Sequence, residues 1–116
     1  MSAIMLAASL IFADPGPVRV QWVMYTAPAW CKPCVEAEAD FGPWLKKSGW
    51  RVGHAATDHV RLIDIDCEVE AAKAAEINGV PTFVLLVDGK EKRRFIRYPG
   101  REFMAREYLR HYERLK

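Results

Sequence analysis

The sequence predicts an α/β fold in which helices cover both faces of a mixed sheet of four or five strands. Three observations lead to this fold class. Segments typical of strands and helices follow one another in the order β, α, β, α, β, β, α. One apolar run, Thr82–Val87, is suited to a strand covered on both faces, and Asp88-Gly89 after it predicts a tight turn into the next strand. With 116 residues the chain has the commonest size of one domain, so we expect a single domain over residues 1–116.

The first half of the chain contains a predicted central strand and a helix. Val18–Tyr25 is rich in β-branched and aromatic residues and is followed by a loop sequence, as expected of a central strand. The composition becomes helical from Cys31 onward, and Pro33 is compatible with the first helical turn, where amides have no partner within the helix. Gly42-Pro43 is expected to kink or break this helix, because proline has no amide proton to donate.

A long surface loop separates that helix from the second strand. Ser48–His59 holds two glycines and has little periodicity, and Trp50 is expected to pack the loop against the core rather than to bind a partner. Val60–Ile65 predicts the second strand. Asp66 is placed to cap the next helix, which we expect to end at Gly79.

The last predicted elements are an outer strand and an amphipathic helix. Phe95–Tyr98 predicts the strand, and Pro99-Gly100 predicts the loop after it. Apolar side chains then recur at spacings of four, four and three residues, which is typical of one buried helix face. They are Met104, Tyr108, Tyr112 and Leu115. Residues 90–116 carry ten basic and four acidic side chains; this mixture favours a solvated surface, so we expect no nucleic-acid partner.

The N-terminal segment Ala3–Ala13 is apolar and has the length of a signal peptide. No Lys or Arg precedes it, and Ile11 stands where a signal peptidase prefers a small residue. We therefore expect a native first strand or short helix in a cytoplasmic protein, with export as the alternative if Ala3–Ala13 is a signal segment. The longest charge-free runs are shorter than the roughly 18 apolar residues that a membrane helix needs, so no membrane span is expected.

The cysteines indicate redox chemistry rather than a scaffold held together by disulfides. Cys31 and Cys34 are separated by two residues at the predicted start of a helix, whereas Cys67 stands apart. Disulfide exchange needs a thiolate, and the unpaired amides and the dipole at a helix N-terminus stabilise one. Lys32 adds a positive charge nearby. Cys34, one helical turn further on, can attack a mixed disulfide that Cys31 has formed.

Two motifs together resemble the thioredoxin superfamily. Trp30-Cys31-Lys32-Pro33-Cys34 follows a hydrophobic strand, and Val80-Pro81-Thr82-Phe83 precedes another strand. The resemblance extends from about Val18 to the C-terminus. It implies a thioredoxin fold in which Cys31 and Cys34 are the redox-active residues.

The resemblance also implies how a substrate is bound. Pro81 would follow a cis peptide bond and lie against the Cys31 sulfur, the Val80 backbone would pair with an extended substrate segment, and Trp30 would flank the binding groove. The candidate substrate-binding residues are Trp30, Lys32, Pro33, Val80 and Pro81.

Two positions depart from the family pattern. Family members usually have a buried Asp six residues before the first cysteine, and this chain has Tyr25 there. They usually have Gly directly after the first cysteine, and this chain has Lys32. A phenol with a pKa of about 10 is a poor base at neutral pH, so we expect the proton transfer from Cys34 to be slow. Lys32 is expected to make the cysteine pair more oxidising, because it favours the reduced form that carries the thiolate.

Other roles for the cysteines are open at this point. The pair could be inert on a redox-silent binding module. A zinc site of the three cysteines with His54 or His59 would lack a second close pair of ligands. Haem attachment is excluded, because Val35 rather than His follows Cys34. Cys67 is expected to be a buried small apolar residue, with a regulatory thiol as the alternative.

These patterns favour a thiol-disulfide oxidoreductase that acts on disulfides of protein substrates. We expect a monomer that serves electron transport and cell redox homeostasis, with no dissociable cofactor and no metal. A redox partner would reset the dithiol. The alternative is a redox-silent thioredoxin-like module that binds proteins.

Overall fold

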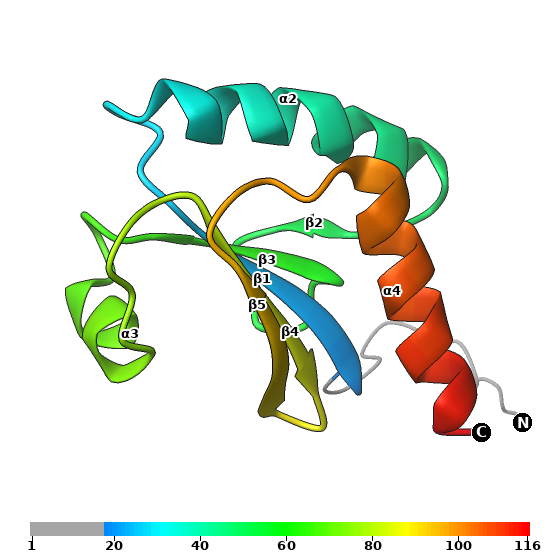
Figure 1. Ribbon diagram of the computed structural model, residues 1–116. Helices are drawn as coiled ribbons and strands as arrows, with labels where there is room; N and C mark the ends of the chain where they lie inside the picture. Colours follow the sequence, from blue (N-terminus) through cyan, green and yellow to red (C-terminus); the bar gives the residue numbers. More distant parts are fainter. Residues whose placement is uncertain (1–17) are drawn as a thin grey trace, which may run out of the picture.

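The computed structural model describes residues 18–116, which form a five-stranded mixed sheet with helices on both faces (Figure 1). The strand order across the sheet is β2-β3-β1-β4-β5. The strands are β1 (Val20–Thr26), β2 (Val52–Gly53), β3 (Val60–Asp64), β4 (Thr82–Val87) and β5 (Lys90–Phe95). The helices are α2 (Lys32–Lys47), α3 (Val69–Ala74) and α4 (Arg101–Arg114). The predicted α/β class with a mixed sheet is confirmed.

The sheet has a parallel half and an antiparallel half that meet at β1. Strand β1 runs parallel to β3, which is parallel to β2, and antiparallel to β4, which is antiparallel to β5. Every residue of β1 is buried, as expected of a strand with neighbours on both sides and helices on both faces. Because β1 leads directly into the loop before α2, the central strand places the start of that helix.

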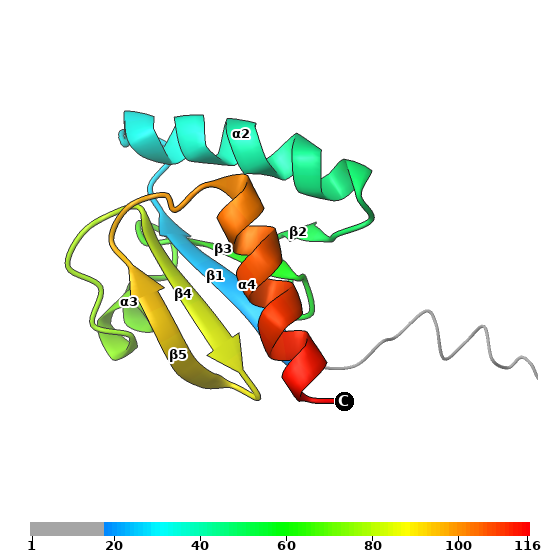
Figure 2. The same cartoon turned by 45° about the vertical axis from the view of Figure 1, so that its right-hand side comes forward.

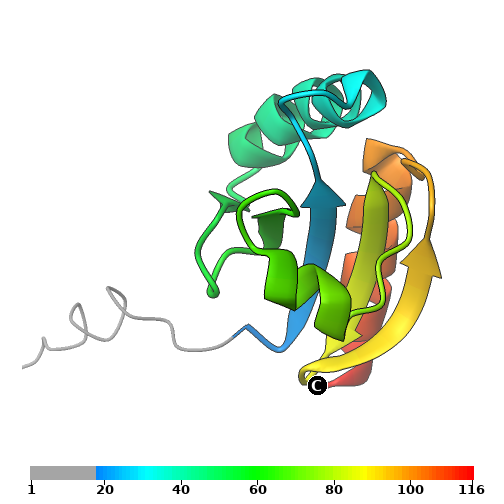
Figure 3. The same cartoon turned by 90° about the vertical axis from the view of Figure 1, so that its left-hand side faces the viewer.

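Different helices cover the two faces of the sheet (Figure 3), and each face carries its own hydrophobic cluster. On one face, α2 and α4 pack against Trp22 and Met24 of β1, and the Trp22 indole donates a hydrogen bond to the Met104 carbonyl at 2.9 Å. On the other face, α3 and the connection after it cover Val23 and Tyr25. Alternate residues of β1 therefore belong to opposite faces, as the pleat requires.

Two predicted elements differ from the observed ones near the centre of the chain. Helix α2 continues through Pro43 without a break, so only one backbone hydrogen bond is lost there. Helix α3 ends at Ala74 and not at Gly79: Glu76 takes a left-handed conformation with φ 55°, and the amide of Ile77 donates to the carbonyl of Ala72. This is a Schellman ending with glutamate in the position that glycine usually takes.

The outer strand also differs from the prediction. It covers Lys90–Phe95 and not Phe95–Tyr98, because an edge strand tolerates charged side chains on its open side and needs no continuous apolar run. The expected loop after α2 contains the short strand β2, and Trp50 packs there with its ring centroid 4.5 Å from that of Tyr108. Trp50 therefore has the packing role that was predicted for it.

The predicted first element, Ala3–Ala13, lies outside the described residues. Within residues 18–116, no helix combines the length and the apolar character needed to cross a membrane.

Candidate active site

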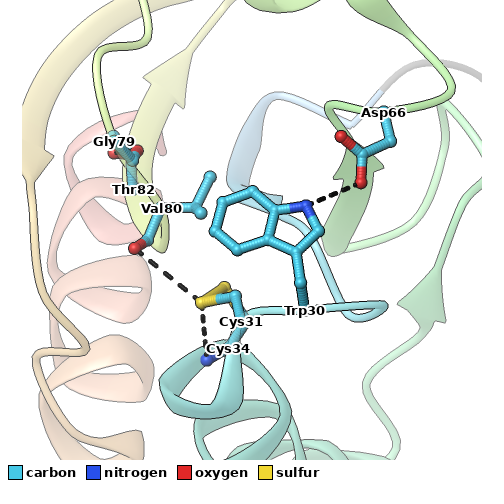
Figure 4. The surroundings of a disulfide bond; sticks show 7 residues. All are labelled: Trp30, Cys31, Cys34, Asp66, Gly79, Val80 and Thr82. Carbon is cyan, nitrogen blue, oxygen red and sulfur yellow. Dashed lines mark hydrogen bonds between the residues drawn. A yellow bond between two sulfur atoms is a disulfide. The ribbon is translucent and has the colours of Figure 1, made fainter.

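The two cysteines meet at the beginning of α2. Cys31 is the N-cap of the helix, with an extended backbone conformation, and its Sγ accepts a hydrogen bond from the amide of Cys34 at 3.2 Å (Figure 4). Pro33 occupies the first turn, where its missing donor costs nothing. Cys31 and Cys34 are joined by a disulfide. The prediction that the helix begins at the cysteine pair is confirmed.

This position stabilises negative charge on Cys31 once the disulfide is reduced. The amide that points at Sγ belongs to the first turn of the helix and also donates to the Cys31 carbonyl at 3.1 Å, and the helix dipole adds to its effect. Lys32 contributes less than its charge suggests, since its side chain is 84% exposed and its Nζ lies 3.9 Å from the Glu36 carboxylate. The helix terminus is therefore the main source of thiolate stabilisation.

Neither sulfur-bearing residue is open to solvent in the disulfide form. Cys31 is 5% exposed and Cys34 is completely buried. Cys31 packs in the same core cluster as Cys34, and Val80 packs against that cluster. Cys31 is still the more accessible of the two.

The segment before β4 approaches the pair from the other side. The Val80-Pro81 peptide bond is cis, as the resemblance implied, and the Val80 carbonyl oxygen lies 3.8 Å from the Cys31 sulfur. The Thr82 hydroxyl donates to the Gly79 carbonyl at 2.6 Å and closes this turn. Figure 4 shows the Val80 carbonyl directed at Cys31.

Trp30 lies beside the pair (Figure 4). Its side chain is largely exposed, and its indole nitrogen donates a hydrogen bond of 2.9 Å to Asp66. Asp66 therefore does not cap α3, as had been expected; Glu68 is the N-cap and makes no side-chain hydrogen bond there. The β3–α3 connection instead orients the tryptophan beside the disulfide.

Comparison of structures relates this architecture to thioredoxins of several organisms. The chain matches a thioredoxin from Fasciola hepatica with a TM-score of 0.62 and 26% identity over 90% of each chain. A thioredoxin variant from Halobacterium salinarum matches with a TM-score of 0.61 and 24% identity, covering 80% of this chain and 74% of that one. Mitochondrial thioredoxin 3 from Saccharomyces cerevisiae in its oxidised form gives 0.61 and 17%, over 90% and 89%.

The chain has the thioredoxin fold. The relationship to the thioredoxin superfamily that the two motifs predicted is confirmed by these structures. No protein-family model matches the sequence, and no curated protein sequence matches it either.

Within this thioredoxin fold, Tyr25 does not lie under the cysteine pair. It belongs to the cluster on the α3 face, where burial raises its pKa, whereas Met24 belongs to the cluster that contains both cysteines. Counting six residues back from Cys31 selects the wrong side of β1, because successive strand residues point to opposite faces. Tyr25 therefore does not take the place of the family's buried Asp, as had been expected from its position six residues before Cys31.

The last residue of β1 in the cluster that contains the cysteine pair is Met24, which is apolar. Met24 is completely buried, and the one buried carboxylate within residues 18–116 is Glu107, which binds Arg93 and Arg110. No buried carboxylate of the described chain is thus free to take the Cys34 proton. The alternation of Trp22 and Met24 with Val23 and Tyr25 was the sequence feature that could have located this position.

Cys67 is exposed and is not the buried apolar residue that was expected. It lies in the polar connection after β3, where the neighbouring Asp64 carboxylate raises the pKa of its thiol.

Two histidines for which the sequence predicted no partner have polar contacts in the structure. His59 Nδ1 accepts a hydrogen bond from the Arg51 amide, and His54 Nδ1 lies 3.1 Å from the Leu62 carbonyl oxygen. Across residues 18–116, no group of three or more potential metal ligands is assembled.

Proposed function

We propose that the protein is a thiol-disulfide oxidoreductase that exchanges disulfides with protein substrates through Cys31 and Cys34. The observation that supports this most is the disulfide between the two cysteines at the N-terminus of α2, with a helix amide donating to the Cys31 sulfur. A site of this kind stabilises the attacking thiolate and also provides a second thiol within reach.

The reaction proceeds in two exchange steps. In the reduced protein, the Cys31 thiolate attacks one sulfur of the substrate disulfide, forms a mixed disulfide and releases the other substrate sulfur as a thiolate. Cys34 then loses its proton and attacks the Cys31 sulfur, which closes the Cys31–Cys34 disulfide and releases the second substrate thiolate. Two electrons pass to the substrate, and a dithiol redox partner returns them to the protein. The reverse sequence oxidises a substrate dithiol.

The residues around the pair bind the substrate chain. The Val80 backbone, followed by Pro81, pairs with an extended segment next to the substrate disulfide, and the exposed Trp30 ring packs against it. Lys32 and Pro33 lie on the exposed first turn of α2, where they contact the same segment. The sulfur chemistry therefore lies on α2, and the flanking segments and the first turn of α2 share the binding.

The test compares three cysteine variants in the reduction of a protein disulfide with dithiothreitol as the electron donor. We expect Cys31→Ser to abolish turnover and Cys34→Ser to accumulate a mixed disulfide that mass spectrometry detects. Cys67→Ser is the matched control, because it makes the same change at an exposed cysteine outside the pair. Turnover by Cys31→Ser equal to that of the unchanged protein would refute the proposal and favour a redox-silent binding module.

A further inference from the structure

The segment between α3 and β4 has to hold a defined shape if its backbone is to bind a substrate. It begins at Ala75, where α3 is capped, and reaches the Val80-Pro81 bond opposite Cys31. In Figure 2 it rises from α3 beside β4 and β5 towards the end of the sheet where α2 begins. Helix α3 has no fully buried residue, so the core holds the start of this segment only weakly.

Arg94, on the edge strand β5, makes a set of contacts that the redox chemistry does not explain. Its guanidinium donates to the carbonyls of Ala75 at 2.7 Å and Glu76 at 3.1 Å. The same group donates twice to the Glu91 carboxylate, both times at 2.8 Å. One side chain thus joins β5 to the backbone at the end of α3.

These contacts fall where the backbone is most in need of support. Carbonyl groups at the end of a helix lack hydrogen-bond partners within the helix. Arg94 supplies donors to the carbonyls of Ala75 and Glu76, the two residues directly after α3. Glu76 has a φ of 55°, which is unfavourable for a residue other than glycine and persists only where the surroundings hold it. The Glu91 carboxylate fixes the guanidinium, so the donors have a set direction.

The far end of the segment is fixed by a different contact. The Thr82 hydroxyl binds the Gly79 carbonyl next to the cis bond. Between the two attachments, Glu76, Asn78, Gly79, Thr82, Arg94 and Ile96 line a pocket of about 140 Å³. Ile77 and Val80 of the segment pack against the core. The pocket leaves the side of the segment that faces Arg94 without such packing, so the polar contacts at its ends add to what holds it in place.

We propose that Arg94 is a positioning residue that holds the 75–81 segment in the conformation in which the Val80 backbone binds an extended protein substrate. This inference rests on the proposed oxidoreductase function. Its consequence is selective: a protein disulfide that pairs with the Val80 backbone needs the ordered segment, whereas a small disulfide that reaches only Cys31 does not. A preordered segment also avoids the entropy cost of ordering it on binding.

The experiment measures KM and kcat for a protein disulfide and for a small aromatic disulfide in the unchanged protein and in three variants. Arg94→Met removes all donors, Arg94→Lys keeps the charge but not the planar fork, and both are expected to raise KM for the protein disulfide about 5- to 30-fold. The kcat with that substrate and both constants with the small disulfide should stay within twofold. Arg93→Met is the matched control, since the neighbouring arginine contacts Glu107 and the Phe95 ring instead, and it should leave KM unchanged.

Hydrogen exchange of the backbone amides gives a readout independent of catalysis. In Arg94→Met we expect faster exchange at residues 77–80 and unchanged exchange in β1 and β4. If the unchanged protein reduces neither substrate, the proposed function fails. If it reduces both, but Arg94→Met and Arg94→Lys affect the two substrates equally or match Arg93→Met, the function stands and the role of Arg94 is refuted.

Discussion

A carboxylate introduced on the face of β1 that carries Met24 should accelerate the resolving step of disulfide exchange. Met24 packs in the cluster that contains Cys31 and Cys34, and Tyr25 packs on the opposite face of the sheet. Met24→Asp therefore places a base on the side of the pair, and Tyr25→Asp places the same group one residue away on the wrong side. The two variants separate proximity to Cys34 from the general effect of a buried acid.

The size of the effect follows from burial and from the strength of general-base catalysis. Met24 is completely buried, so burial would raise the pKa of an aspartate at this position. A rise of about 3 units, which is typical of buried carboxylates, would leave about half of the aspartate ionised at pH 7. A positioned base contributes roughly 10²- to 10⁴-fold. We expect the mixed disulfide to resolve at least tenfold faster in Met24→Asp at pH 7.

Both substitutions lower the stability of the fold. Loss of a buried methionine costs about 2–5 kcal/mol and loss of a buried aromatic side chain about 3–5 kcal/mol, compared with about 5–15 kcal/mol for a whole domain. Each variant also buries a carboxylate, which adds to this cost. Circular dichroism at the assay temperature therefore has to establish that each variant is folded. Met24→Asn repeats the change in shape without the charge.

The assay mixes reduced protein with an excess of a small aromatic disulfide that releases a coloured thiolate in each exchange step. The slow phase reports attack by Cys34 and is followed from pH 6 to 9. In the unchanged protein its rate should rise with pH toward the pKa of the Cys34 thiol, whereas in Met24→Asp the profile should flatten above neutral pH. Equal acceleration by folded Tyr25→Asp or Met24→Asn, or none by folded Met24→Asp, would refute the reasoning.

Three further predictions concern the charges of the molecule. Alkylation of the reduced protein should modify Cys31 before Cys34 and at lower pH, because a helix amide donates to the Cys31 sulfur; modification of Cys34 first would reverse the assigned roles. Lys32→Gly should lower the reduction potential by no more than about 20 mV in a redox titration, since a solvated charge contributes at most roughly 1 kcal/mol at 4 Å, and a larger drop would show direct contact with the thiolate. Glu107→Gln should lower the free energy of unfolding by about 1–2 kcal/mol at pH 7 and by much less at pH 3, measured in urea. The sign follows because Arg110 lowers the pKa of Glu107, so its stabilisation is complete above the usual carboxyl range and is lost as the pH falls below about 4; an equal loss at both pH values would contradict this.

Elements set by local patterns were predictable from the sequence. The apolar run of β4 and the buried strand β1 bury side chains in the order that the sequence shows. On α4 the predicted face is only partly correct: Met104 is buried, but Tyr112 is 44% exposed and Glu107 is buried instead. Elements set by tertiary contacts were not. The charged strand β5 exists because β4 offers it a hydrogen-bonding edge, and α3 ends early at Glu76, a residue that carries no sequence signal for a helix end.

The same distinction applies to the candidate site. The helix start at Cys31 and the cis bond before Pro81 were predictable because each belongs to a short motif. The position of Tyr25 was mistaken because a count through the loop before Cys31 does not preserve which face of β1 a residue occupies. The role of Asp66 was missed because its indole partner lies 36 residues earlier in the chain.

The site brings together two segments that lie far apart in the sequence, and substitutions in one should act separately from substitutions in the other. The sulfurs lie on α2, and the backbone proposed to bind substrate lies in the 75–81 segment, which Arg94 attaches to β5. The two meet where the Val80 carbonyl approaches the Cys31 sulfur. A change on the exposed first turn of α2 therefore alters the stability of the thiolate and hence the reduction potential, while a change at Arg94 alters the affinity for a protein substrate. Because the two sets of contacts share no side chain, their effects on the free energy of the transition state should add in a double variant of Lys32 and Arg94.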